Sequence, residues 1–146
     1  MQLKPRYNKG DRIGQRYQVH EVLMGGMGEV YLCLDLETIR PLALKTFQAR
    51  FFTNQRIREL FSSEVATWVA LEKHPNIVRC FFLDEIENQP FMLLEWVIGN
   101  ELDGNSLRSM LRRGALGLRP ALDRTIDICR GLIHADRKRP GISTGT

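Results

Sequence analysis

Three glycines within four residues interrupt two stretches that otherwise show strand periodicity. Gly25, Gly26 and Gly28 lie between the alternating pattern of residues 17–22 and that of residues 30–34. Glycine weakens a strand because it costs backbone entropy and offers no side chain to pack. Two interpretations are open: a tight hairpin in which glycine supplies positive φ, or a backbone flap over a ligand, whose bare N–H groups bind phosphate.

The remaining pattern predicts an α+β fold, with an antiparallel sheet, one helix inserted between its strands, and further helices after it. Every link between strands is a short hairpin except the helical one, which is typical of antiparallel pairing. Apolar residues alternate in the strands and recur every three or four residues in the helices. The expected strands are 17–22, 30–34, 42–47, 78–83 and 91–97, and the expected helices are 55–72, 106–112 and 120–137.

Composition excludes several classes of function. The chain has 146 residues, enough for one domain with a core. A net charge of +4, with Lys and Arg scattered along the chain, argues against nucleic-acid binding. No apolar run approaches the ~18 residues of a membrane segment, and the first residues lack a signal-peptide pattern. Cys33, Cys80 and Cys129 are odd in number and far apart, so we expect no disulfide framework or zinc site, and a reducing, cytoplasmic location.

A cation and a carboxylate are placed to meet between sheet and helix. Ala43 and Lys45 are two residues apart in one strand and therefore share a face. Glu64 falls inside the apolar stripe of the helix, one turn after Leu60 and one turn before Trp68. Because an unpaired buried charge is costly, we expect Glu64 to pair with Lys45. The alternative is a solvated Glu64 at the edge of the stripe.

In order and spacing, the segments GGMGEVY, LALK, HPNIV and FMLLEWV resemble the N-terminal lobe of protein kinases. The sequences GGMGEVY and HPNIV are most similar to those of the eukaryotic-like serine/threonine kinases of bacteria. The resemblance implies a five-stranded antiparallel sheet with one helix as the kinase N-lobe, followed by the first helices of an incomplete C-lobe. The corresponding segments are a polar lead-in at 1–16, the N-lobe at 17–99, the partial C-lobe at 100–140 and a divergent tail at 141–146.

The resemblance implies that the glycines lie over the phosphates of ATP, with Met27 at the tip of the loop. Lys45 then contacts the α- and β-phosphates, and Glu64 holds Lys45 in place. One departure occurs within the motif, because Leu23 stands where the first glycine of GxGxxG is usual.

The resemblance also implies an adenine and ribose site. Val30 and Ala43 then lie around the ring, and Leu94 occupies the gatekeeper position. The hinge consists of Glu95, Trp96 and Val97. Glu101 contacts the ribose, with Asp103 as the weaker candidate.

The catalytic elements of the family are missing from this sequence. In the family, the HRDxxxxN loop supplies a base and a magnesium ligand, and DFG supplies a second magnesium ligand. His134-Ala135-Asp136 is not that loop, because it falls in a predicted helix and Gly141 stands where the asparagine is needed. We therefore expect a chain that contacts ATP weakly, lacks the protein ligands for Mg²⁺ and is inactive alone. A reading-frame change, a premature stop or a cut end would each produce such a sequence.

Two other functions compete with an ATP-binding kinase fragment. The first is a non-catalytic, pseudokinase-like module that binds a partner protein. The second is a basic module that binds nucleic acid, but the basic cluster at 130–139 is more typical of a solvated helix end, where cations favour the dipole. The predicted helix 120–137 carries a wide apolar stripe. We expect this helix to fray, self-associate or be covered by a partner.

Overall fold

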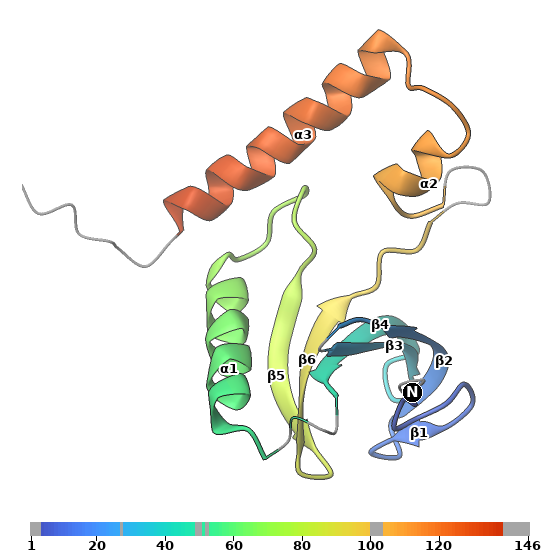
Figure 1. Cartoon of the computed structure of the whole chain (residues 1–146), viewed down its shortest axis with the longest axis vertical. Helices are drawn as coiled ribbons and strands as arrows, with labels where there is room; N and C mark the ends of the chain where they lie inside the picture. The colour runs from blue at the N-terminus through green and yellow to red at the C-terminus, as the bar shows by residue number, and fades with distance from the viewer. Residues whose placement is uncertain (1–3, 27, 49–50, 52, 100–103, 139–146) are drawn as a thin grey trace, which may run out of the picture. The chain divides into compact units, whose positions relative to one another are not determined.

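The computed structural model of the chain describes residues 4–26, 28–48, 51, 53–99 and 104–138 (Figure 1). Within these residues it contains six strands and three helices. The strands are β1 (Arg12–Ile13), β2 (Tyr17–Met24), β3 (Gly28–Asp35), β4 (Arg40–Phe47), β5 (Cys80–Ile86) and β6 (Gln89–Glu95), and the helices are α1 (Gln55–Ala70), α2 (Leu107–Leu111) and α3 (Leu118–Arg137).

The six strands form one curled antiparallel sheet in the order β1-β2-β3-β4-β6-β5. The α+β fold and all five expected strands are confirmed. The sixth strand, β1, was not predicted, because two residues are too few to show an alternating pattern. β1 lies inside the segment that the sequence marks as a polar lead-in, so the sheet begins earlier than expected.

One face of the sheet carries the hydrophobic core. Tyr31, Leu44 and Leu93 lie opposite one another on β3, β4 and β6, and each is at most 1% exposed. Alternation of side chains along each strand puts these three on the same face. Two residues of the N-terminal segment, Tyr7 and Ile13, join the same core.

Polar contacts fasten the N-terminal segment to the β5–β6 turn. The Tyr7 hydroxyl donates to Glu87 Oε2 at 2.8 Å. The pKa of Tyr7 is raised to about 12, mainly by burial and secondly by this hydrogen bond. Arg6 Nη1 donates to Gln89 Oε1 at 2.7 Å, and Gln89 Nε2 donates to Thr46 Oγ1 at 2.9 Å. The N-terminal segment is therefore part of the sheet unit.

A second polar cluster closes the β3–β4 turn. Arg16 donates two hydrogen bonds to the Asp35 carboxylate, at 2.8 and 2.7 Å. Asp35 also accepts from the Thr38 hydroxyl at 2.7 Å and from the Glu37 backbone N–H at 3.0 Å. The Arg16 guanidinium, helped by these donors, holds the pKa of the buried Asp35 carboxyl well below its usual range.

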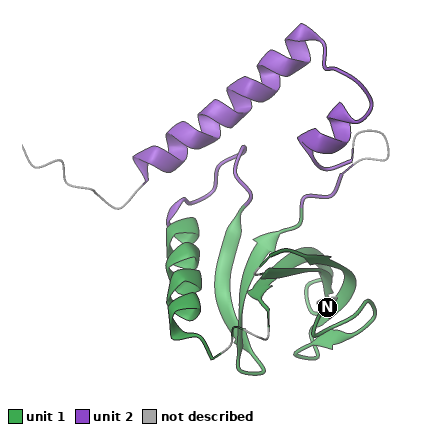
Figure 2. Cartoon of the chain, in the orientation of Figure 1, with its two compact units in different colours: residues 1–69, 79–96 green, residues 70–78, 97–146 purple. Residues whose placement is uncertain are grey.

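The chain divides into two compact units, shown in green and purple in Figure 2. Residues 1–69 and 79–96 make up the first unit, which contains the sheet and nearly all of α1. The second unit, residues 70–78 and 97–146, contains α2 and α3.

Inside the second unit, α3 packs on residues 70–78 through a close backbone approach and a histidine pair. Gly131 is the buried residue of α3, and a Cβ there would lie 3.0 Å from the Asn76 carbonyl oxygen. The His134 ring stacks on His74 at 4.6 Å between centroids, and its Nε2 lies 2.6 Å from the Leu71 carbonyl oxygen. The expectation that His134 is helical is confirmed.

Candidate functional site

The sheet face opposite the core gathers the side chains expected around an adenine ring. Val30 pairs with Lys45, and Ala43 pairs with both Leu32 and Leu94 in the register of β3, β4 and β6. Directly opposed residues point to the same side of a sheet, so all five share one face. Ala43 is 6% exposed and Leu94 is 8% exposed, which leaves a shallow apolar floor beside Lys45.

Lys45 and Glu64 form the predicted ion pair. Lys45 Nζ lies 2.5 Å from Glu64 Oε1, and it also lies 5.9 Å from the centroid of the Trp68 ring. Phe61 holds α1 against the sheet through an edge-to-face contact with Phe47, with 5.4 Å between ring centroids. Because the side chains of Lys45 and Glu64 are 30% and 42% exposed, the pair contributes less than about 1 kcal/mol to stability. The main effect of the ion pair is that it fixes the position of the Lys45 ammonium group.

Gly25 and Gly26, between β2 and β3, and Gly28, the first residue of β3, do not supply positive φ. None of Gly25, Gly26 and Gly28 has φ between +20° and +160°. The Gly25 N–H donates to the Gly28 carbonyl at 2.9 Å, which closes the turn, and only Gly28 is crowded, with Thr46 O 3.1 Å from a built Cβ. A Cβ at Gly26 would meet nothing within 4 Å. The turn therefore has glycines that its own conformation and packing do not require, which favours the interpretation as a flap over a ligand. Met27 lies outside the described residues.

The first two residues of the expected hinge, Glu95 and Trp96, lie at the end of β6 and directly after it. Glu95 is exposed, and its backbone N–H donates to the Arg79 carbonyl at 2.9 Å. Its carboxylate accepts the Arg79 backbone N–H at 3.2 Å. The Trp96 ring lies 5.9 Å from the His20 ring.

The rest of the expected hinge belongs to the second unit. Val97 is 45% exposed, and its carbonyl accepts a bond from Asn105 Nδ2 at 3.4 Å. The expected ribose contacts, Glu101 and Asp103, lie outside the described residues.

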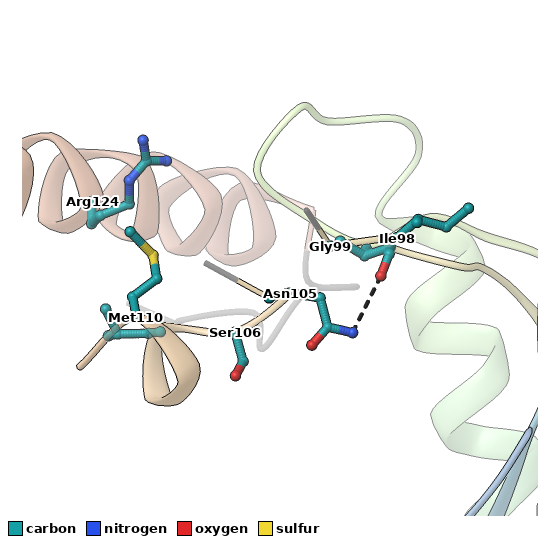
Figure 3. A pocket seen from close by; sticks show the side chains of 9 residues that line it. Ile98, Gly99, Asn105, Ser106, Met110 and Arg124 are labelled. Carbon is teal, nitrogen blue, oxygen red and sulfur yellow. Dashed lines mark hydrogen bonds between the residues drawn. The ribbon is translucent and has the colours of Figure 1, made fainter. Parts of the chain in front are cut away.

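Two cavities contain residues of the expected ATP site. Lys45 and Glu64 line a mainly apolar cavity of ≈ 310 Å³ between β4 and α1, which also touches Gly28 and Leu60. A separate pocket of ≈ 470 Å³ in the second unit contains Val97 but no other described residue of the expected ATP site (Figure 3). Of these two cavities, the first contains the Lys45–Glu64 ion pair and the second does not.

Neither a metal centre nor a membrane span is found in the described part of the chain. Within it, no group of three or more His, Cys, Asp or Glu is placed to hold a metal ion. None of its helices combines the length and the apolar character needed to cross a membrane.

Sequence reasoning missed one polar residue at the glycine turn. Gln48, directly after β4, is 3% exposed, and its Nε2 donates to the Gly25 carbonyl at 2.8 Å. No motif or periodicity singles out Gln48. Its position next to a strand end is the only signal that the sequence contains.

The fold is similar to that of protein-kinase domains. It superposes on the PknI kinase domain of Mycobacterium tuberculosis with a TM-score of 0.66, 22% sequence identity, and coverage of 91% of this chain and 52% of that one. A second structure of the same domain gives a TM-score of 0.65.

Sequence relatives make the assignment more specific. The chain is 33% identical over 141 residues to the serine/threonine-protein kinase PksC of Streptomyces coelicolor, covering 88% of this chain and 25% of that protein. It is 31% identical to PknB of Mycolicibacterium smegmatis, covering 89% of this chain and 22% of PknB, and 30% identical to PknA of Mycobacterium tuberculosis, covering 90% and 32%. No family model matches the chain.

The chain is therefore a homologue of the bacterial serine/threonine protein kinases and corresponds to the N-terminal part of their kinase domain. It spans between 22% and 32% of the length of these curated relatives.

Proposed function

We propose that this chain is the ATP-contacting part of a serine/threonine protein kinase, and that alone it binds ATP weakly without transferring phosphate. The observation that carries the proposal is the Lys45–Glu64 ion pair beside the open glycine turn. A fixed ammonium group next to a glycine turn, whose backbone a ligand can approach closely, is an arrangement that suits a polyphosphate. Because ATP is the proposed ligand, the proposal includes a cytoplasmic location.

The proposed ATP contacts are those that the resemblance to protein kinases implies. Gly25, Gly26, Met27 and Gly28 cover the phosphates, and Lys45, held by Glu64, contacts them. Val30, Ala43 and Leu94 enclose the ring, Glu95, Trp96 and Val97 offer backbone groups to it, and Glu101 reaches the ribose. ATP supplies the transferable phosphoryl group, and Mg²⁺ in the family neutralises its charge.

We propose inactivity because the means of phosphoryl transfer are absent from these 146 residues. The reaction depends on positioning and on metal-mediated neutralisation of charge. The sequence has neither an HRDxxxxN loop nor a DFG segment. Asp136, the carboxylate that most resembles the base, is an exposed residue of α3.

A second candidate function is a pseudokinase-like module that binds a partner protein. The observation in its favour is the apolar surface of α3, on which Leu118 is 79% exposed and Leu132 is 65% exposed. The two functions are compatible, since the ATP contacts and α3 belong to different elements.

Nucleotide titration of the wild-type chain and of two variants tests the proposal. Lys45→Met should weaken ATP binding by about 10- to 100-fold, the value of hydrogen bonds to a charged group. Glu64→Gln should weaken it less, because the ammonium group remains. Neither variant should change the free energy of unfolding by more than about 1 kcal/mol. Lys138→Met, which removes an exposed ion pair with Glu72, is the matched control.

The titration contradicts the proposal if wild-type protein does not bind ATP at millimolar concentration, or if Lys45→Met binds it as well as wild type does. A transfer assay with ATP, Mg²⁺ and a generic protein acceptor tests the inactivity. Phosphate transfer above background would refute it, and Asp136→Ala would then show whether Asp136 is the base.

A further inference from the structure

The side chain of Gln48 reaches from the end of β4 to the turn between β2 and β3. It is 3% exposed, and its Nε2 donates to the carbonyl oxygen of Gly25 at 2.8 Å. The N–H of Gly25 donates in turn to the Gly28 carbonyl at 2.9 Å, and Gly28 pairs with Phe47, the residue before Gln48. Gln48 thus adds a side-chain bond to the turn just beyond the last backbone pair.

Only half of the Gln48 amide is used. Its Oε1 is buried and has no hydrogen-bond partner among the described residues. Gln89, the other fully buried glutamine of the sheet unit, uses both ends of its amide, with Arg6 and Thr46. A buried acceptor without a partner loses its hydration and gains nothing in return, so an apolar side chain of similar size should be tolerated at position 48. Stability of the fold does not explain why glutamine is there.

We propose that Gln48 is a positioning residue that fixes the Gly25–Gly28 turn in the conformation that receives the phosphates of the nucleotide. The inference rests on the proposed function. Gly25 and Gly26 have no side chains that could pack against the sheet, and a Cβ built at Gly26 would meet nothing within 4 Å. The bond from Gln48 raises the fraction of molecules whose turn is ready to bind, and apparent affinity scales with that fraction.

If Gln48 fixes the turn, its loss should weaken the binding of ATP and leave the binding of adenosine unchanged. A turn that contacts phosphates affects ATP and leaves adenosine unaffected. Loss of one neutral hydrogen bond corresponds to about a two- to tenfold change in an equilibrium constant. The ratio of ATP affinity to adenosine affinity should therefore fall by that factor when Gln48 loses its donor.

The test compares Gln48→Met with Gln89→Met in the full 146-residue chain. Three quantities are measured: the exchange rate of the Gly25 amide hydrogen by NMR, the dissociation constants of ATP and adenosine, and the midpoint of thermal unfolding. Gln48→Met should speed Gly25 exchange about two- to tenfold, lower the ATP-to-adenosine affinity ratio by the same factor, and leave the unfolding midpoint unchanged or higher. Gln89→Met should lower the unfolding midpoint and leave the affinity ratio unchanged.

Two results overturn the inference. One is a Gln48→Met variant with wild-type Gly25 exchange and a wild-type affinity ratio. The other is a variant that loses as much thermal stability as Gln89→Met, which would make Gln48 a structural residue. Failure of the proposed function is distinct, because wild-type protein would then bind neither ligand. In that case faster Gly25 exchange in Gln48→Met still supports the anchoring of the turn, and unchanged exchange overturns it.

Discussion

The core face of the sheet and the apolar stripe of α3 have similarly regular apolar patterns and opposite surroundings. Leu44 and Leu93 on the sheet are at most 1% exposed, whereas Leu132 and Ile126 on α3 are 65% and 46% exposed. Burial contributes about 25 cal/mol per Å² of apolar surface, so the first pattern stabilises this stretch of chain and the second does not. An apolar periodicity indicates that a face can be buried against another element. It does not indicate which element or which chain buries it.

The contacts that hold α3 within its own unit are of a different kind. They include the glycine approach to Asn76, the stack of His134 on His74, and an ion pair of 2.9 Å between Lys138 and Glu72. Exposed ion pairs are each worth less than about 1 kcal/mol. The stability of α3 should therefore be local and low, while that of the sheet is set by its core.

The largest expected difference between the two regions is in amide hydrogen exchange. Amides of β4 and β6 should exchange at least about a thousandfold more slowly than those of α3, since core strands open only with the whole unit. Segment-resolved exchange on the isolated chain measures this. Protection of α3 that vanishes on dilution would indicate self-association. Strong protection of α3 in a monomer at every concentration would show that the contrast is wrong.

Matched truncations of leucine sharpen the comparison. Leu44→Ala, at 0% exposure, should lower the free energy of unfolding by about 2–5 kcal/mol through lost burial and a cavity. Leu132→Ala, at 65% exposure, should change it by less than about 0.5 kcal/mol, because alanine and leucine are both good helix formers. Denaturant titration measures both. A similar loss at the two sites would mean that α3 has a cover inside the chain.

The smallest of the three effects comes from the polar cluster at the β3–β4 turn. Asp35→Asn should cost about 1.5–3 kcal/mol at pH 7, because it removes a charged acceptor from Arg16. The lowered pKa of Asp35 means that this stabilisation is present above the unfolded value of about 4 and is lost as pH falls below it. The difference in the free energy of unfolding between wild type and Asp35→Asn should therefore shrink from pH 5 to pH 2.

Denaturant titrations across that pH range measure this difference. Asp123→Asn, an exposed carboxylate of α3, is the control and should change stability by less than about 0.5 kcal/mol. A difference that stays constant to pH 2 would mean that the Asp35 charge is not involved.

Much of the sheet unit could be predicted, because its signals are periodic. Alternation located five strands and put Ala43 and Lys45 on one face, and the helical stripe placed Glu64 opposite them. The ion pair is confirmed, but the burial assumed for it is not, because the Glu64 side chain is 42% exposed and its neighbour Leu60 is 62% exposed. Each of these inferences uses a pattern that repeats within a few residues.

The missed features depend on single residues and distant partners. Tyr7 sits in a polar stretch, and its hydroxyl acceptor on Glu87 is 80 residues away. Arg16 and Asp35 are 19 residues apart, and neither belongs to a motif. Gln48 acts through one bond to a backbone carbonyl, which any polar residue near a turn could make. Such contacts depend on the register of the finished sheet.

The bond between Arg6 and Gln89 joins residues 83 positions apart, and this has a consequence for synthesis. A ribosome adds about 5–20 residues per second, so the N-terminal segment waits roughly 4–17 s for the strand that fastens it. During that interval the Tyr7 side chain has no core to enter, and β1 has no completed sheet to extend. A segment that is made before the sheet is therefore among the last to be secured.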